Sequence, residues 1–159
     1  MKRLLLIPIL IVAASSLALS QTDAKTKSNP FAGTWKANLS KSKQHPNHRF
    51  QSATIRFEVA DDVVLLIFTG INMAGEKESG TRKLRPDGKE YPVAAAPGVV
   101  EVAKWVGSHA LETTAMKDGK VIGRGAYEVS SDGKTLTARI KGIDASGAEF
   151  EQVIVFDRE

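Results

Sequence analysis

The stretch Phe31-Ala32-Gly33-Thr34-Trp35-Lys36 carries the pattern of a first β-strand. From Gly33 onward, small or apolar residues alternate with polar ones: Gly33, Trp35, Ala37 and Leu39 fall on one face, and Thr34, Lys36 and Asn38 on the other. An apolar face opposite a polar face, repeating every two residues, is typical of a half-buried strand. Gly33 leaves the backbone room to bend, and the Trp35 indole is large enough to fill one end of a barrel. The stretch therefore predicts a barrel strand with Trp35 turned inward.

Strand and turn signals continue along the rest of the chain. The turns are marked by short polar or glycine-containing groups at Asp61-Asp62, Ala74-Gly75, Pro86-Asp87-Gly88-Lys89, Pro97-Gly98, Lys117-Asp118-Gly119-Lys120, Ser131-Asp132-Gly133-Lys134 and Ser146-Gly147. They recur about every 10 to 15 residues, a spacing that favours hairpins joined in sequence over a Greek key sandwich. No convincing helix follows residue 20. Residues 30–159 are therefore predicted to form an all-β domain, an antiparallel up-and-down β-barrel of about eight to ten strands.

The alternation also predicts which side chains point into the barrel. Inward faces are expected to carry Ile55, Phe57 and Val59, then Val121, Gly123, Gly125, Tyr127 and Val129, then Leu136, Ala138 and Ile140, and finally Phe150, Gln152, Ile154, Phe156 and Arg158. The phase of residues 99–106 is ambiguous, because its valines compete with Ala103 and Trp105 for the inner face. Val63–Phe68 is apolar on both faces, which predicts the most buried strand or one whose outer face is covered. Pro92 places its short strand at an edge or beside a bulge.

The opening stretch resembles the first-strand signature of the lipocalins and fatty-acid-binding proteins, the calycin group. It is still more similar to the opening of small secreted bacterial lipocalin-like proteins of unassigned function. Those proteins carry a Tyr-Pro-Val segment, here Tyr91-Pro92-Val93, and an Asp-Gly-Lys-Thr-Leu-Thr hairpin, here residues 132–137. The resemblance covers about residues 30–159 and implies a lipocalin-like barrel that holds a small apolar molecule. Fatty-acid-binding proteins typically hold a carboxylate with an Arg-x-Tyr pattern. The last strand has Phe156-Asp157-Arg158 instead, so a fatty-acid specificity is not implied.

The first 20 residues have the order of a secretory signal peptide. Lys2 and Arg3 form a charged start, and Leu4–Ala14 is apolar but too short to span a membrane. Ala18-Leu19-Ser20 offers small residues for cleavage after Ser20; an uncleaved anchor is the alternative. The polar, non-periodic residues 21–29 are expected to form a disordered linker. The mature domain is thus predicted to be exported, to the periplasm or outside the cell, with no integral membrane span after cleavage.

Composition narrows the expected partners. The chain has 159 residues, no cysteine and a formal net charge of +4, half of which comes from Lys2 and Arg3. Without cysteine there is no disulfide, no lipid-modified Cys and no Cys nucleophile. No cluster of basic residues interleaved with aromatic ones is present, so nucleic acid is not an expected partner. The mature length suits a single domain that buries its own core.

The sequence shows no catalytic or metal-binding constellation. It contains no G-x-S-x-G elbow, and no helix follows its turn glycines to make a phosphate loop. The carboxylates are expected at turns and on outer faces, where spacing assigns none of them to acid–base work. His45 and His48 lie three apart in the polar loop 40–49, but Pro46 separates them and no third ligand is near in sequence. No metal or cofactor is therefore predicted, and an enzyme is only the third alternative, kept open because lipocalin-like folds sometimes host isomerases or hydrolases.

Polar and aromatic residues in phase with the inner faces are the candidate ligand contacts. Tyr127 is in phase with Val129, and Gln152 with Ile154. In a hollow barrel these two side chains would anchor a ligand among apolar walls, whereas in a filled barrel they would be satisfied core residues. The aromatic rings of Phe57 and Trp105 are candidates for the apolar wall.

Two functions follow from these patterns. Gly123 and Gly125 on an inner face leave space, which favours an exported binding module that carries or sequesters a small apolar or amphiphilic ligand. The alternative is a filled barrel with a structural or interaction role, in which Val63–Phe68 serves as a partner or homodimer surface.

The two ends of the chain are expected to close the barrel. In an up-and-down barrel the first and last strands are neighbours, because closure removes the free edges of the sheet. Trp35 and Arg158 are both on inner faces by phase, so the guanidinium is predicted to lie across the indole. The resemblance implies the same contact, since lipocalins are similar in pairing a first-strand Trp with a basic residue of the last strand.

Overall fold

A computed structural model describes residues 29–144 and 146–159. The predicted signal peptide, residues 1–20, and all of the predicted linker except Asn29 lie outside the described residues. Within the described part, ten strands form one antiparallel sheet. Their bounds are β1 Gly33–Ala37, β2 Phe50–Ala60, β3 Val63–Asn72, β4 Lys77–Leu84, β5 Asp87–Pro92, β6 Val99–Trp105, β7 Ala110–Lys117, β8 Lys120–Val129, β9 Thr135–Ile143 and β10 Glu149–Arg158. The predicted all-β, up-and-down barrel is confirmed.

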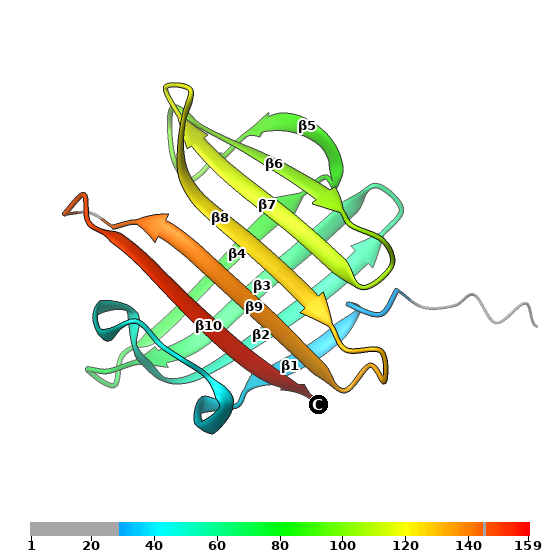
Figure 1. Cartoon of the computed structure of the whole chain (residues 1–159), viewed down its shortest axis with the longest axis vertical. Coiled ribbons are helices and arrows are strands. Elements are labelled where there is room, and N and C mark those ends of the chain that lie inside the picture. Colours follow the sequence, from blue (N-terminus) through cyan, green and yellow to red (C-terminus); the bar gives the residue numbers. More distant parts are fainter. Residues whose placement is uncertain (1–28, 145) are drawn as a thin grey trace, which may run out of the picture.

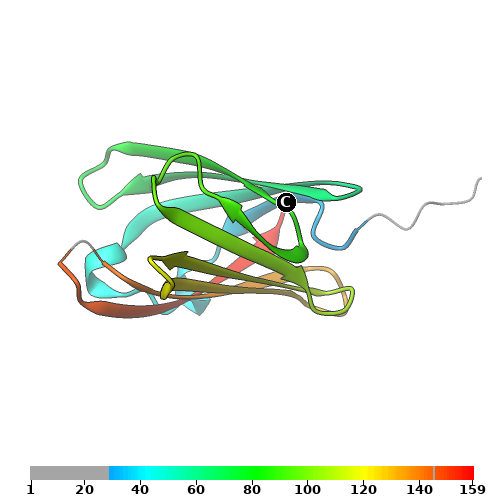
Figure 2. The same ribbon diagram turned by 90° about the horizontal axis from the view of Figure 1, so that it is seen from above.

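The sheet curls over so that its two halves cross each other. Figure 1 shows β7 to β10 in front of β2 to β4, with the strands of the two layers running at a wide angle. Seen from above, the layers enclose a flattened interior (Figure 2). Each strand is joined to the next along the chain, and side chains at every second position face the interior, as a barrel of hairpins requires.

The barrel is not fully closed. β1 pairs with β10, so the first and last strands are neighbours as predicted. The order β4-β3-β2-β1-β10-β9-β8-β7-β6-β5 leaves β4 and β5 as unpaired edges. Gly88, in the predicted turn, has a φ of +80° within β5, and the register shifts between Asp87 and Glu90. β5 therefore arches away rather than pairing back on β4 (Figure 1), and the expectation that closure removes every edge was wrong. The predicted edge position of Pro92 is confirmed.

One end of the barrel, called here the closed end, is packed with aromatic rings. Trp35 and Phe31 are fully buried there. The Phe31 ring lies 5.4 Å from that of Phe57 and 5.2 Å from that of Trp105, measured between centroids. The Phe57 ring lies edge-on to Tyr127, at 5.9 Å. These contacts belong to a single buried cluster that continues through aliphatic residues of both layers. The closed end is therefore filled by its own side chains.

The structure resolves the phases that the sequence left open. In β6 the inward residues are Glu101, Ala103 and Trp105, while Val100 and Val102 face outward. In β3, Val64 and Leu66 are buried, whereas the outward residues Val63, Leu65 and Ile67 are only half-buried. Val63–Phe68 is therefore an alternating strand and not one buried on both faces.

The connection from β1 to β2 follows β10 instead of crossing the barrel. It contains two short 3-10 turns, η1 (Leu39–Lys41) and η2 (Pro46–His48). Between them, Lys43 exchanges backbone hydrogen bonds with Val153 of β10. No helix in the described part of the chain is long and apolar enough to cross a bilayer.

Candidate ligand-binding site

Small residues line the half of the barrel that lies away from the closed end. Gly123 of β8 pairs with Gly142 of β9 and with Ala115 of β7, which puts three small residues side by side on the inner face. On the opposite layer, a Cβ added at Gly80 of β4 would have no heavy atom within 4 Å. A cavity of about 270 Å³ lies against β7, β8 and β9 at this level. Missing side chains thus leave space in this half, whereas the closed end is filled.

Tyr127 reaches from the closed end into this cavity. Its ring lies against Gly125, because a Cβ at Gly125 would sit only 3.0 Å from a ring carbon and 3.3 Å from the hydroxyl oxygen. The same position would be 2.7 Å from Thr113 Oγ1. The space left by the missing side chain of Gly125 is therefore a notch that Tyr127 and Thr113 fill. The sequence had predicted free space there. Both side chains are buried, and both line the cavity.

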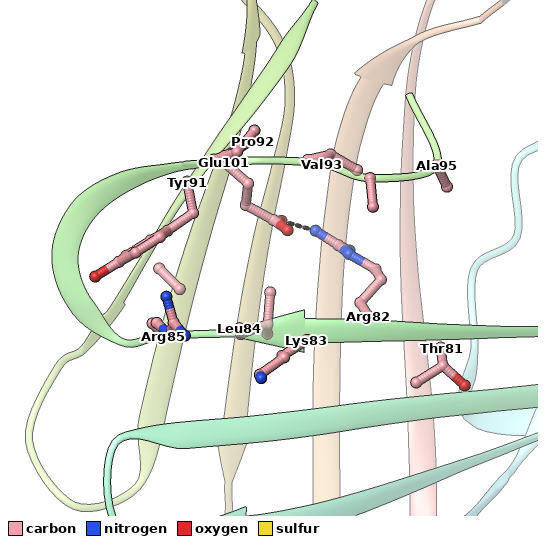
Figure 3. Close-up of a pocket in the computed structure, with 12 residues that line it drawn as sticks. Thr81, Arg82, Lys83, Leu84, Arg85, Tyr91, Pro92, Val93, Ala95 and Glu101 are labelled. Carbon is pink, nitrogen blue, oxygen red and sulfur yellow. Dashed lines mark ion pairs between the residues drawn. The ribbon is translucent and has the colours of Figure 1, made fainter. Parts of the chain in front are cut away.

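A buried ion pair crosses the opening between the sheet edges. Arg82 of β4 contacts the carboxylate of Glu101 on β6, as Figure 3 shows. The Glu101 side chain is 9% exposed and that of Arg82 is 42% exposed, so the carboxylate is inside and the guanidinium lies at the opening. Near it, the Arg85 guanidinium lies over the Tyr91 ring of β5, 4.9 Å from its centroid. Side-chain contacts thus connect the two edges of the sheet, between which there is no backbone pairing.

Arg82 connects two hollows. One is the interior cavity, and the other is a hollow of about 420 Å³ in the opening between β4 and β5, which Arg82 lines together with Glu101, Leu84 and Tyr91. Burial raises the pKa of the Tyr127 hydroxyl above its ordinary value of 10.0, and the nearby Arg82 guanidinium opposes that rise. Tyr127 is therefore a neutral hydroxyl at physiological pH, able both to donate and to accept a hydrogen bond.

Gln152 adds a fourth polar side chain at the same level. The register runs from Gln152 to Ile140, and from Ile140 to Gly125, so Gln152 lies two strands from the notch under Tyr127. Its Oε1 atom is buried and has no hydrogen-bond partner among the described residues. A buried amide oxygen without a partner is uncommon and marks a place for a donor. We call the four side chains of Arg82, Thr113, Tyr127 and Gln152 the polar belt.

The four predicted ligand contacts occupy different places. Tyr127 lines the interior cavity, whereas Gln152, which lies at the same level of the sheet, lines neither of the cavities described above. Phe57 and Trp105 lie instead in the aromatic cluster of the closed end, and neither lines the cavities described above. The contact of these residues with a ligand stays a prediction.

Sequence reasoning missed the charged members of the site. Glu101 was expected on an outer face or a turn, as all carboxylates were, and this was wrong because the inward phase of β6 buries it. Arg82 sits in a strand whose other residues, apart from Leu84, are exposed. The inward position of Ala103 and Trp105 was the one signal that could have placed Glu101 inside.

Aromatic rings cover the rim of the cavity. Phe150 lies over Gly142, where an added Cβ would come within 2.9 Å of the ring. The His48 ring lies on that of Phe150 at a tilt of 36°, with 4.0 Å between centroids, and the His45 ring lies 5.4 Å from that of His48. Among residues 29–144 and 146–159, no group of three or more side chains is arranged to hold a metal ion.

Comparison with known proteins identifies the fold. The sequence matches no protein-family model and no curated protein sequence. Among solved structures it is similar to the wild-type fluorescent protein UnaG, with 20% identity and a TM-score of 0.55, over 81% of this chain and 97% of that one. It is also similar to zebrafish ileal bile acid-binding protein complexed with cholic acid, with 14% identity and a TM-score of 0.52, over 82% and 99% of the two chains. The fold is thus that of the calycin-type up-and-down barrels.

Proposed function

We propose that this protein is a binding module that takes up a small apolar or amphiphilic molecule in its barrel. The observation that carries the proposal is the interior cavity of about 270 Å³, which combines apolar walls with the buried polar groups of Tyr127 and Thr113. Ligand sites are typically concave and mostly apolar, with a few polar groups that fix orientation. A neighbour of the same fold is a bile acid-binding protein solved with cholic acid, which supports a ligand of this class.

The proposed place of action is the exported compartment. Support comes from residues 1–20, whose charged start, apolar stretch and small residues before Gln21 have the order of a signal peptide. Fractionation of the producing cell, with N-terminal sequencing of the mature protein, tests this part. A mature chain that still begins at Met1 in the cytoplasm would contradict it.

The binding function can be tested by ligand extraction and by substitutions that fill the cavity. Organic extraction of the natively purified protein followed by mass spectrometry should release a bound small molecule, and the emptied protein should bind the neutral dye Nile red. Gly123→Leu places a side chain in the cavity, where an added Cβ meets only ordinary contacts at 3.6 and 3.8 Å, and should abolish dye binding. Ala126→Leu, on the outer face of the same strand, is the matched control and should bind as the wild type does. Equal binding by all three proteins would place the dye outside the cavity and contradict the proposal.

A second candidate function uses the outer face of β3. Val63, Leu65 and Ile67 form a half-buried apolar row there. Charged residues flank the row, since Leu65 pairs with Glu58 on one side and with Lys83 on the other. Their stems cover part of the apolar surface, so the row offers little area to a partner. A solution mass of twice the monomer, reduced to the monomer by Leu65→Lys, would favour this interaction role.

A further inference from the structure

We infer that the polar end of the ligand is uncharged, and that Glu101 is the residue that excludes a carboxylate from the cavity. The inference rests on the proposed binding function and adds the chemical class of the ligand. It follows from the way charge and hydrogen-bonding groups are distributed around the polar belt.

The charge of Arg82 is already compensated. An isolated arginine facing an apolar cavity would be a ready site for a carboxylate. Here the guanidinium contacts the Glu101 carboxylate, and that carboxylate is almost fully buried. The remaining members of the polar belt, Thr113, Tyr127 and Gln152, carry no charge. Arg82 and Glu101 are the inward-facing charges at this site, and they contact each other. Arg124 and Lys141 also border the interior cavity, but both are exposed and out of phase with the inner faces of β8 and β9.

A ligand carboxylate at Arg82 would lie next to a second carboxylate. Like charges within a few ångströms disfavour each other strongly where the surroundings are poorly solvated. Binding would require either breaking the pair, which leaves Glu101 buried without its partner, or protonating one of the two carboxylates. Water around the partly exposed Arg82 screens part of this repulsion. It does not solvate the Glu101 carboxylate, because that side chain is buried more deeply.

A hydroxyl or carbonyl group meets no such obstacle. The Tyr127 hydroxyl can donate to it or accept from it, and Thr113 lies on the same side of the cavity. These groups suit the neutral head of an alcohol or a ketone.

The cavity of about 270 Å³ is partly open, so it can hold the polar head and the first part of a ligand while the rest extends out of it. Decanol and decanoate are therefore a suitable pair of probes, because they share a chain and differ in the charge of the head. Their affinities can be compared by displacement of Nile red and by calorimetry at neutral pH.

For the wild type we expect decanol to bind at least about tenfold more tightly than decanoate. Glu101→Gln removes the buried negative charge while keeping the shape of the side chain, and it should reverse the preference in favour of decanoate. Glu112→Gln is the control, because Glu112 is an outward carboxylate of β7 that pairs with Lys104, and it should leave the preference unchanged.

The outcomes separate the inference from the function on which it rests. Tighter binding of decanoate than of decanol by the wild type would overturn the inference while supporting a binding function. Binding of neither probe, with no displacement of Nile red, would overturn both. A Glu101→Gln protein that folds, as judged by circular dichroism, and still prefers decanol would remove Glu101 from the explanation. If that variant does not fold, the wild-type comparison alone decides whether a carboxylate is excluded.

Discussion

The guanidinium of Arg158 lies over the indole of Trp35, with its Cζ atom 4.0 Å from the ring centroid. The two residues are direct partners across β10 and β1, so the contact sits where the ends of the chain meet. The geometry agrees with the phase of the two strands in the sequence. The guanidinium also donates hydrogen bonds to the carbonyl oxygens of Gly133, at 2.6 Å, and Ala32, at 2.9 Å. Arg158 thereby ties the segment before β1 and the turn before β9 to the last strand.

Replacing Arg158 should destabilise the barrel more than replacing an outward arginine. Arg158→Ala removes the cation over the indole and the donors to three backbone carbonyls, those of Gly133, Ala32 and Pro30, for an expected loss of about 2 kcal/mol in the free energy of unfolding. Arg139→Ala is the control, because Arg139 makes one exposed ion pair at 3.7 Å, worth little. Thermal unfolding measures both variants. Equal melting temperatures would mean that the contact at the chain ends does not hold the barrel closed.

Trp35 should be among the most costly residues of the barrel to truncate. It is fully buried, and its Nε1 donates a hydrogen bond to the carbonyl oxygen of Phe31 at 2.9 Å. Trp35→Ala leaves a cavity and an unpaired buried carbonyl, so we expect a loss of about 3 to 5 kcal/mol. Trp35→Phe keeps most of the packing and should cost about 1 to 3 kcal/mol. Urea denaturation gives both values, and a Trp35→Ala protein as stable as Trp35→Phe would show that the site collapses around the smaller residue.

The contact between Arg158 and Trp35 also requires a glycine at position 33. Its φ is +126°, a region that L side chains rarely adopt, and an added Cβ would lie 3.0 Å from Arg158 Nη1. Gly33→Ala should therefore destabilise the protein by about 1 to 3 kcal/mol, from backbone strain and from displacement of the guanidinium. Repeating the substitution in the Arg158→Ala background separates the two causes, because only the strain remains there. The same loss in both backgrounds would exclude a clash with Arg158.

Local patterns predicted the fold and the chain-end contact well. The period of two in residues 33–37 and 121–129 requires no knowledge of distant neighbours, and it placed Trp35 and Tyr127 inside. It was wrong for Leu39, which lies in η1, and for Val121, because both side chains are exposed. Glu101 could not be placed in this way. Burial of a carboxylate depends on a cation elsewhere in the chain, and Arg82 reaches it only because β4 and β6 face each other across the opening.

The opening between β4 and β5 could not be predicted from the sequence for a related reason. Pro86-Asp87-Gly88-Lys89 reads like the other turns of the chain, and nothing local shows that β4 and β5 diverge after it. Strand pairing is decided by the curvature of the whole sheet, which a turn signal does not report. The candidate site combines an unpaired edge with a buried ion pair, so most of it lay beyond what periodicity predicts.

Ionisation of Tyr127 should weaken the fold at alkaline pH. Burial raises the pKa of its hydroxyl in the folded state above the ordinary value of 10.0, against the opposing effect of Arg82. Above about pH 10 the unfolded chain then releases this proton while the folded chain retains it, so the free energy of unfolding falls as the pH rises. Below pH 10 both states keep the proton and the effect is absent.

Tyr127→Phe should lose less stability between pH 9 and pH 11 than the wild type does, whereas Tyr91→Phe, at the partly exposed second tyrosine, should follow the wild type. Urea denaturation at a series of pH values measures the three slopes. A Tyr127→Phe slope equal to that of the wild type would mean that the hydroxyl is solvated, and would remove it from the buried polar belt.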